Sequence, residues 1–211
     1  MKTMTYEDSD FNIYWEGACC GLMNDISKEK ICKAIYDDAY PFTEGLAAVK
    51  TGGKWGFIDY SAVEVIKPIY DEVSSFSDGL AAVKLGKYGY INRMNEIIIP
   101  FQFFNAYPFK NGVAVVNEKQ GYKLSLINSS GVRISSFYKE IRQYEYGFFI
   151  VENEFQGVIN KIGTIIFPLS LDIAWMLNRT YLIALKDQNW NIINIATKNE
   201  QVLSMMMCIL Q

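Results

Sequence analysis

At 211 residues the chain is long enough for one large domain or two small ones. Half of the residues are hydrophobic and 15% are aromatic, so a sizeable core is expected and disorder is not. A formal net charge of −3, without a cluster of Lys or Arg, argues against nucleic acid as a partner. Histidine is absent, which excludes Ser-His-Asp and Cys-His catalysis within this chain.

The first eight residues contain no apolar h-region, and no apolar run reaches the ~20 residues that cross a bilayer. We therefore expect a cytoplasmic protein that does not bind or span a membrane. The four cysteines show neither a disulfide framework nor the spacing of a zinc site: Cys19, Cys20, Cys32 and Cys208. The sequence predicts no metal site and no cofactor.

A plausible strand at residues 11–15 opens the chain, and a repeated pattern follows it. The nine residues from Phe42 to Lys50 match the nine from Phe76 to Lys84, which lie 34 positions later, and a weaker copy covers residues 109–116. A fixed period of this length is the sequence signature of a repeat architecture.

A second signature, Trp55-Gly56-Phe57-Ile58-Asp59, comes just after the first. It occurs six times about 34 residues apart, and its fifth residue is always Asn or Asp. Its copies start at Cys20, Trp55, Tyr88, Leu124, Gln156 and Trp190. A third signature follows each of the clearest copies and contains an Ile or Phe beside a proline, as in Lys67-Pro68-Ile69-Tyr70 and, more loosely, Ile99-Pro100-Phe101.

Each copy predicts three short strands, for which residues 80–84, 88–92 and 97–101 are the clearest example. Runs of β-branched and aromatic residues between Gly, Asn and Asp clusters are typical of strands. The recurrent Asn or Asp suits a turn, because its side chain can bond the backbone two residues on. The glycine after Trp or Tyr is expected to relieve crowding or to take a positive φ. The recurrent proline places its strand at a sheet edge or a bulge.

These motifs resemble the WG-repeat (KWG-repeat) family of bacterial proteins, which is named for the Trp-Gly pair. Lys54-Trp55-Gly56-Phe57-Ile58-Asp59 fits best, and the resemblance is strongest over residues 34–117. It implies a β-rich repeat fold without enzymatic activity, and it supplies no functional residues to transfer.

The predicted fold is all-β: a single domain, 1–211, of six tandem three-stranded repeats in an open, curved array. The alternative is a closed, six-bladed, propeller-like ring in which the strand at residues 11–15 completes the last unit. Both arrangements satisfy the need of a marginal three-stranded unit to share its core with neighbours.

The repeated columns of residues have a structural and a functional interpretation. Trp55, Tyr88 and Trp190 are expected to be core residues of their repeats, and an aromatic binding strip is the alternative. The Asn/Asp column is expected to serve turns rather than cations. Acidic pairs such as Asp37-Asp38 and Asp71-Glu72 are expected to be solvated strand ends rather than catalytic carboxylates.

The predicted function is a non-catalytic protein-binding module, and a small acidic immunity or inhibitor protein is one form that would fit. The later copies depart from the consensus while staying apolar, which favours an interface there. The residues predicted to bind the partner are Phe148, Phe149, Phe155, Trp175 and Tyr181. A homo-oligomer is compatible with the sequence. A carbohydrate or cell-wall binder is the alternative, with exposed aromatic side chains stacking on sugars, and an enzyme is the least favoured class.

Overall fold

The computed structural model describes residues 7–118, 123–144 and 147–203. For Phe148 it describes the backbone but not the side chain. Its only helical element within these residues is one 3-10 turn, Asp8–Asp10, and everything else is strand, turn or loop. The described part of the chain therefore contains no helix that could cross a membrane. The chain divides into two compact units, Met1–Lys110 with Ser129–Gly131 and Asn111–Asn128 with Val132–Gln211, which we call unit 1 and unit 2.

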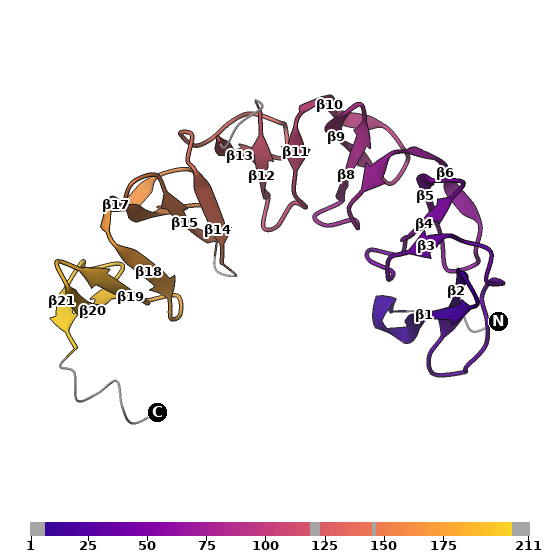
Figure 1. The fold of residues 1–211 in the computed structure, drawn as a ribbon, viewed down its shortest axis with the longest axis horizontal. Helices are drawn as coiled ribbons and strands as arrows, with labels where there is room; N and C mark the ends of the chain where they lie inside the picture. The colour runs from indigo at the N-terminus through magenta and orange to yellow at the C-terminus, as the bar shows by residue number, and fades with distance from the viewer. Residues whose placement is uncertain (1–6, 119–122, 145–146, 204–211) are drawn as a thin grey trace. The chain divides into compact units, whose positions relative to one another are not determined.

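Unit 1 consists of a hairpin, two four-stranded antiparallel sheets and one further short strand (Figure 1). The hairpin is β1 (Phe11–Glu16) and β2 (Cys19–Asn24). The first sheet contains β3 (Asp38–Ala39), β4 (Ala47–Thr51), β5 (Lys54–Ile58) and β6 (Glu64–Tyr70), and the second contains β7 (Glu72–Val73), β8 (Leu80–Leu85), β9 (Lys87–Asn92) and β10 (Ile97–Phe103). The further strand is β11 (Asn105–Ala106).

Unit 2 repeats this plan with one antiparallel pair and two four-stranded sheets. The pair is β12 (Val113–Asn117) and β13 (Leu124–Asn128). The next sheet contains β14 (Glu140–Gln143), β15 (Phe148–Glu152), β16 (Gln156–Asn160) and β17 (Ile165–Leu171). The last sheet contains β18 (Ile173–Met176), β19 (Tyr181–Lys186), β20 (Asn189–Asn194) and β21 (Glu200–Val202).

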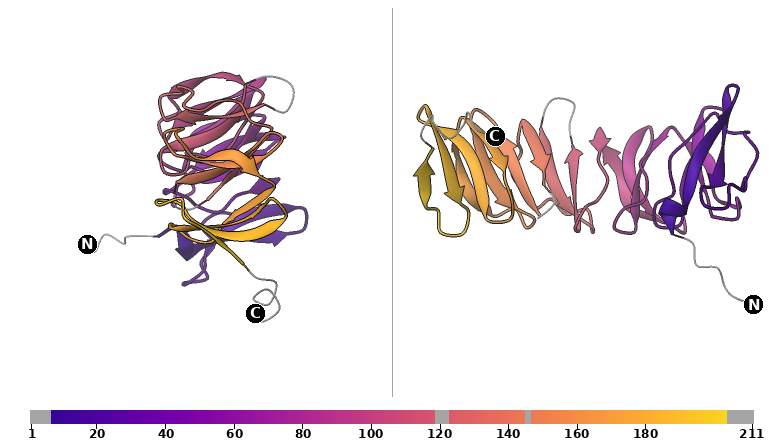
Figure 2. Two further views of the ribbon diagram at one scale, coloured as in Figure 1. Left: turned by 90° about the vertical axis from the view of Figure 1, so that its left-hand side faces the viewer. Right: turned by 90° about the horizontal axis from the view of Figure 1, so that it is seen from below.

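The core of each unit lies between successive sheets, which stack face to face (Figure 2). In unit 1, Trp55, Phe57 and Ile66 of the first sheet pack with Val83 and Ile91 of the second. In unit 2, the same kind of cluster joins the last two sheets: Ile150, Val158, Phe167, Leu171, Ala174, Leu182, Ala184, Ile193 and Ile195. Because a single sheet of this size is marginal alone, each sheet depends on its neighbour for burial.

The all-β prediction is confirmed, but each complete sheet has four strands rather than three. In unit 1 the additional strand is the two-residue β3 or β7, which pairs through Asp38↔Lys50 or Glu72↔Lys84, and in unit 2 it is the four-residue β14 or β18. Two residues are too short to show the period-2 alternation that marks a strand in a sequence. These two residues come directly after the third signature, so no turn signal in the sequence separates the short strand from the strand before it.

The strand predicted at residues 11–15 does not complete the last sheet. It forms β1, which pairs over its whole length with β2 in unit 1, from Phe11↔Asn24 to Glu16↔Cys19. The last sheet has four strands of its own. The pairing with β2 is local because only a two-residue turn separates the two strands.

The glycine and proline signatures are explained together by a bulged edge strand. β6 is the edge of its sheet, and its register against β5 shifts between Phe57↔Ile66 and Trp55↔Tyr70. The bulge brings the backbone so close that a Cβ on Gly56 would lie 2.4 Å from the Ile66 carbonyl oxygen. Crowding, and not a positive φ, therefore requires glycine here.

The Asn/Asp column closes the turn after the second long strand of each repeat, as predicted. The Asp59 side chain accepts hydrogen bonds from the backbone N–H groups of Ser61 and Val63, each at 2.9 Å. Asn92 accepts in the same way from Met94 and Glu96, at 3.0 and 2.9 Å. An asparagine side chain likewise accepts a hydrogen bond from the backbone of a residue two to four positions later at Asn24, Asn128, Asn160 and Asn194.

Candidate interaction surfaces

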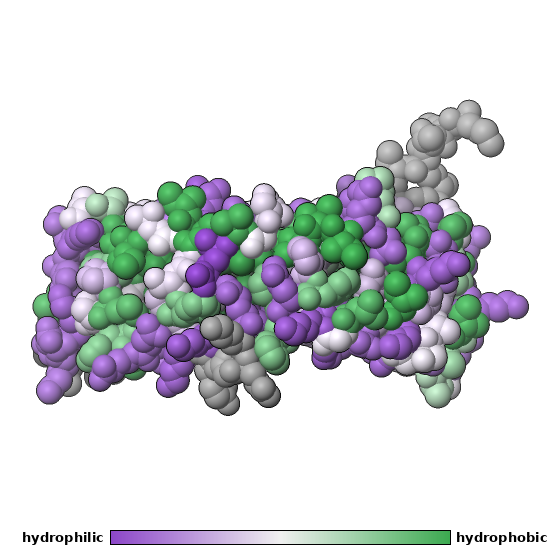
Figure 3. Space-filling model, turned by 90° about the horizontal axis from the view of Figure 1, so that it is seen from above, coloured by the Kyte–Doolittle hydropathy of each residue, from purple (hydrophilic) through white to green (hydrophobic). Residues whose placement is uncertain are grey.

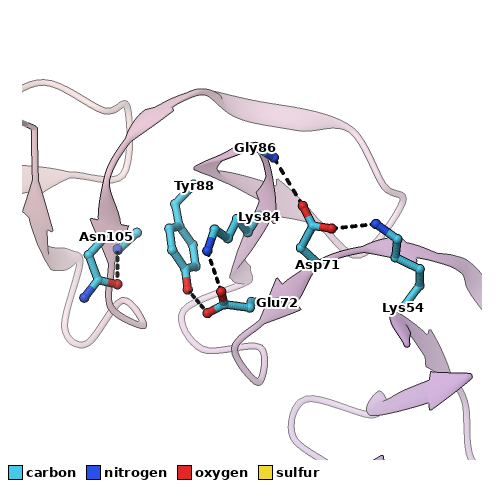
Figure 4. Close-up of polar contacts among 8 residues, drawn as sticks. Lys54, Asp71, Glu72, Lys84, Gly86, Tyr88 and Asn105 are labelled. Atoms are coloured by element: carbon cyan, nitrogen blue, oxygen red, sulfur yellow. Dashed lines mark hydrogen bonds and ion pairs between the residues drawn. The ribbon is translucent and has the colours of Figure 1, made fainter. Parts of the chain in front are cut away.

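An acidic, a basic and an aromatic side chain meet at one edge of the second sheet of unit 1 (Figure 4). Lys84 Nζ lies 2.5 Å from Glu72 Oε1 and 5.4 Å from the centre of the Tyr88 ring, and the Tyr88 hydroxyl donates to Glu72. The hydrogen bonds from Lys84 and Tyr88 lower the pKa of Glu72, while burial and the bond to Glu72 raise the pKa of Tyr88. Near neutral pH, Glu72 is therefore ionised and Tyr88 is neutral, and their hydrogen bond fixes the position of both side chains.

The preceding sheet carries a related arrangement. Asp38 of β3 lies opposite Lys50 in the strand register, and Lys50 Nζ lies 5.7 Å from the centre of the Trp55 ring. Tyr40 packs on the other side of this group, with its ring centre 4.6 Å from that of Trp55. Tyr40 is exposed, whereas Trp55 is only 5% exposed. Tyr40 is therefore an exposed aromatic side chain supported by a buried one.

An ion pair links the two sheets of unit 1 beside this edge. Lys54 Nζ of β5 lies 2.5 Å from Asp71 Oδ1, and Asp71 Oδ2 accepts a 3.3 Å hydrogen bond from the Gly86 backbone (Figure 4). The bond from Lys54 lowers the pKa of Asp71. Asp71, which lies between β6 and β7, and its neighbour Glu72 thus bond different partners.

The outer edge strands of unit 1 expose apolar side chains in small groups: Val65, Ile69, Ile97 and Ile98. In the view of Figure 3, apolar side chains form separate groups with polar side chains between them. Small separated groups of this kind are ordinary on a protein surface. They are not assigned to a contact.

In unit 2, the last sheet carries aromatic residues on the face opposite its core. Trp175 of β18 and Trp190 of β20 stack with ring centres 5.5 Å apart and planes 12° apart. Tyr181 of β19 lies on the same face, because Trp175 pairs with Ile183 and residues two apart on a strand share a face. Trp175 is 45% exposed and Tyr181 is 40% exposed, while Leu182, the next residue after Tyr181 on β19, is fully buried on the other face.

A profile of the WG-containing repeat matches three consecutive stretches of the chain, residues 21–55, 55–87 and 88–122. Residues 21–122 belong to the WG-containing repeat family. A comparison with curated proteins found no match.

The solved structures that resemble this chain are propeller-like, and their low identity makes the likeness one of fold alone. Hsv2 of Kluyveromyces marxianus matches with a TM-score of 0.56 at 10% identity, over 92% of this chain and 81% of that one. Hsv2 of Kluyveromyces lactis matches with a TM-score of 0.55 at 11% identity, over 92% and 82%. A eukaryotic initiation factor matches with a TM-score of 0.51 at 10% identity, over 92% and 73%.

The WG repeat is offset from the sheets. The stretch 55–87 begins at Trp55 on β5 and ends after β8, so it gives two strands to one sheet and two to the next. Each WG repeat is therefore shared between neighbouring sheets. This sharing ties successive sheets together covalently as well as through the common core.

Of the residues predicted to bind a partner, the structure brings Trp175 and Tyr181 together on the last sheet. Phe155 is 44% exposed but lies between β15 and β16, in the preceding sheet. Phe149 is 1% exposed and belongs to a core cluster with Val113 and Leu126, so its ring is not available to a partner. The side chain of Phe148 lies outside the described residues.

The structure adds Trp190 to this face, whereas the sequence predicts Trp190 to be a core residue of its repeat. Trp190 pairs with Leu185 on β19, and its side chain is half-buried rather than buried. The equivalent Trp55 is buried, as predicted. The sequence signal that could have distinguished the exposed Trp190 from the buried Trp55 is its place in the series of repeats, because Trp190 begins the last of the six signatures.

The described residues contain no group of three or more Cys, Asp or Glu side chains that could hold a metal ion. Burial raises the pKa of the thiols of Cys20 and Cys32, so both favour the neutral form. Cys208 lies outside the described residues.

Proposed function

We propose that this chain is a non-catalytic WG-repeat module that binds another protein through the exposed face of its last sheet. The observation that carries the proposal is the aromatic group Trp175, Trp190 and Tyr181, which is partly exposed on a sheet whose opposite face is core. Trp and Tyr are enriched at the energetic centres of protein interfaces.

The geometry favours a protein over a sugar. The two indole rings stack on each other, so each has one ring face already covered. The neighbouring side chains on this face are largely apolar: Ile183, Leu185 and Ile192. A sugar-binding platform needs polar groups around a flat exposed ring, whereas a protein interface needs an apolar centre.

The experiment compares the two aromatic surfaces of the molecule. A partner that copurifies in a fixed ratio is identified and then titrated against Trp175→Glu and Tyr181→Glu. The matched set is Tyr40→Glu and Tyr107→Glu, at two exposed tyrosines of unit 1. We expect the first pair to weaken binding by more than about 2 kcal/mol, or roughly 30-fold, and the second pair to leave it unchanged.

The reverse result would place the contact on unit 1. Retention on glycan resins with no stoichiometric protein would favour the carbohydrate alternative. A concentration-dependent sedimentation coefficient that Trp175→Glu abolishes would identify the partner as a second copy of the chain.

We also propose that the repeats number six and form an open array. The pairing of β1 with β2 supports this, because it occupies the strand that would otherwise close a ring. Small-angle scattering provides the test, since an open array has a larger radius of gyration than a ring of the same mass.

A further inference from the structure

A groove of about 350 Å³ lies in unit 2 between the edge strand β17 and the turns at one end of the last sheet. Its apolar walls come from β17 and from the segment after β20. Its two charged residues come from the β18–β19 and β20–β21 turns. The lining residues are Ile165, Ile166, Arg179, Ile195, Ala196 and Lys198.

Both turns that carry the charges are fixed by asparagine side chains. Asn178 Oδ1 accepts from the backbone of Thr180 at 2.8 Å and of Tyr181 at 3.0 Å. Asn194 Oδ1 accepts from the backbone N–H groups of Ala196 and Thr197, each at 3.0 Å. The Ile195 N–H donates to the Thr180 carbonyl at 2.8 Å and so joins the two turns. These bonds fix the backbone of both turns that carry the charges.

The charges of the groove have one sign. Arg179 and Lys198 are its only titratable lining residues, although the chain as a whole has a net charge of −3. Within the described residues, Lys198 forms no ion pair. An apolar floor beneath two cations complements a molecule with an apolar body and an anionic end.

We propose that this groove binds an aliphatic chain that ends in a carboxylate. The chain would lie on Ile165, Ile166 and Ile195, and the carboxylate would meet the positive charge that Lys198 and Arg179 place at this end of the groove. A volume of 350 Å³ equals that of roughly a dozen water molecules at about 30 Å³ each, which suits a short chain and not a long lipid. The proposal is independent of the protein-binding face.

Two sources share this chemistry: a free aliphatic acid and the carboxyl terminus of a peptide that ends in an aliphatic residue. The probes are therefore octanoate and an acetylated dipeptide ending in leucine. Each is paired with its neutral amide. The carboxylate that binds more tightly identifies the source.

The chain offers a closely matched control. Lys28 and Lys198 occupy the same position of equivalent turns, with φ of 59° and 60°. Asn24 and Asn194 bracket these turns with the same pattern of side-chain bonds. Glycine adopts this φ freely, so Lys28→Gly and Lys198→Gly remove one charge each without straining the backbone.

The test is titration calorimetry of the full chain with each probe. We expect at least one carboxylate to bind, its amide to bind about tenfold more weakly, and Lys198→Gly to weaken binding about tenfold. Lys28→Gly should match the wild type. Ile166→Glu, which places an acid in the wall, should abolish binding.

Three outcomes would overturn the proposal. These are the absence of saturable binding of either carboxylate in the millimolar range, equal binding of acid and amide, and equal effects of Lys28→Gly and Lys198→Gly. Melting curves of both glycine variants establish that each is folded, so that a lost signal reports the groove.

Discussion

Glu44 and Gly79 join the turns of two successive repeats: the Glu44 carboxylate accepts a hydrogen bond from the Gly79 N–H at 3.0 Å. The same relationship begins one step earlier. Asp8 accepts from the backbone of Glu44 at 2.6 Å and of Gly45 at 2.9 Å. These turns have positive φ at both central residues, 51° and 80° in the first, which exposes their N–H groups to an anion. Each carboxylate thus caps the turn of the next repeat.

Loss of these caps should destabilise unit 1. We expect Glu44→Ala to lower the free energy of unfolding by about 1 kcal/mol and Asp8→Ala by about 2 kcal/mol, because Asp8 also accepts from the Tyr60 hydroxyl at 2.6 Å. Denaturant unfolding measures both. Glu154→Ala, an exposed acid in a turn of unit 2, is the control and should change stability little.

The glycine beside the bulge should be less replaceable than a glycine in an open turn. In Gly56→Ala the new Cβ would lie 2.4 Å from the Ile66 carbonyl oxygen and 2.7 Å from the Pro68 nitrogen, so we expect a cost of about 3 kcal/mol. Gly52 has a φ of 58° and open space around it, so Gly52→Ala should cost only about 1 kcal/mol. Equal losses in thermal unfolding would contradict the crowding explanation.

The sequence could predict those features that recur in phase and act locally. The Asn/Asp turns depend on residues a few positions apart, and the glycine at Gly56 and the aromatic residue at Trp55 recur in phase along the chain; the structure confirms these turns, the crowding at Gly56 and the burial of Trp55. The short strands β3 and β7 were missed because their pairing depends on Lys50 and Lys84, more than ten residues away. Two residues cannot show a period.

The aromatic face of the last sheet could be predicted only in part. Trp175 and Tyr181 meet on it because β18 and β19 pair in a particular register, which the sequence does not state. Phe149 was placed on the surface for its apolar character, but the alternation of β15 turns it into the core. The exact position of the proline also depends on the register. Pro68 lies two residues after Ile66, the partner of Phe57, whereas Pro100 lies one residue after Ile99, the partner of Tyr90.

Trp55 and Trp175 should behave differently when truncated. Trp55 is 5% exposed and packs with Phe57 and Tyr70, so Trp55→Ala should cost about 3–5 kcal/mol. Trp175→Ala should cost about 1 kcal/mol, mainly the stacking on Trp190. Chemical denaturation measures both. A fully stable Trp55→Ala would favour the aromatic binding strip instead.

The Glu72 group should make stability depend on pH in the acid range. Hydrogen bonds from Lys84 and Tyr88 lower the pKa of Glu72 below its ordinary value of 4.5. A carboxylate with a lowered pKa in the folded state contributes stability above its unfolded pKa, and this contribution is lost as the pH falls through the folded pKa. The difference in melting temperature between wild type and Glu72→Gln should therefore be largest near neutral pH and should shrink below about pH 4.5.

Glu29→Gln provides the control, because Glu29 is exposed and its side chain forms no ion pair within the described residues. A Glu72→Gln difference that stays constant from neutral pH to pH 3 would show that the lost contact is one of shape and hydrogen-bond number, and not of charge.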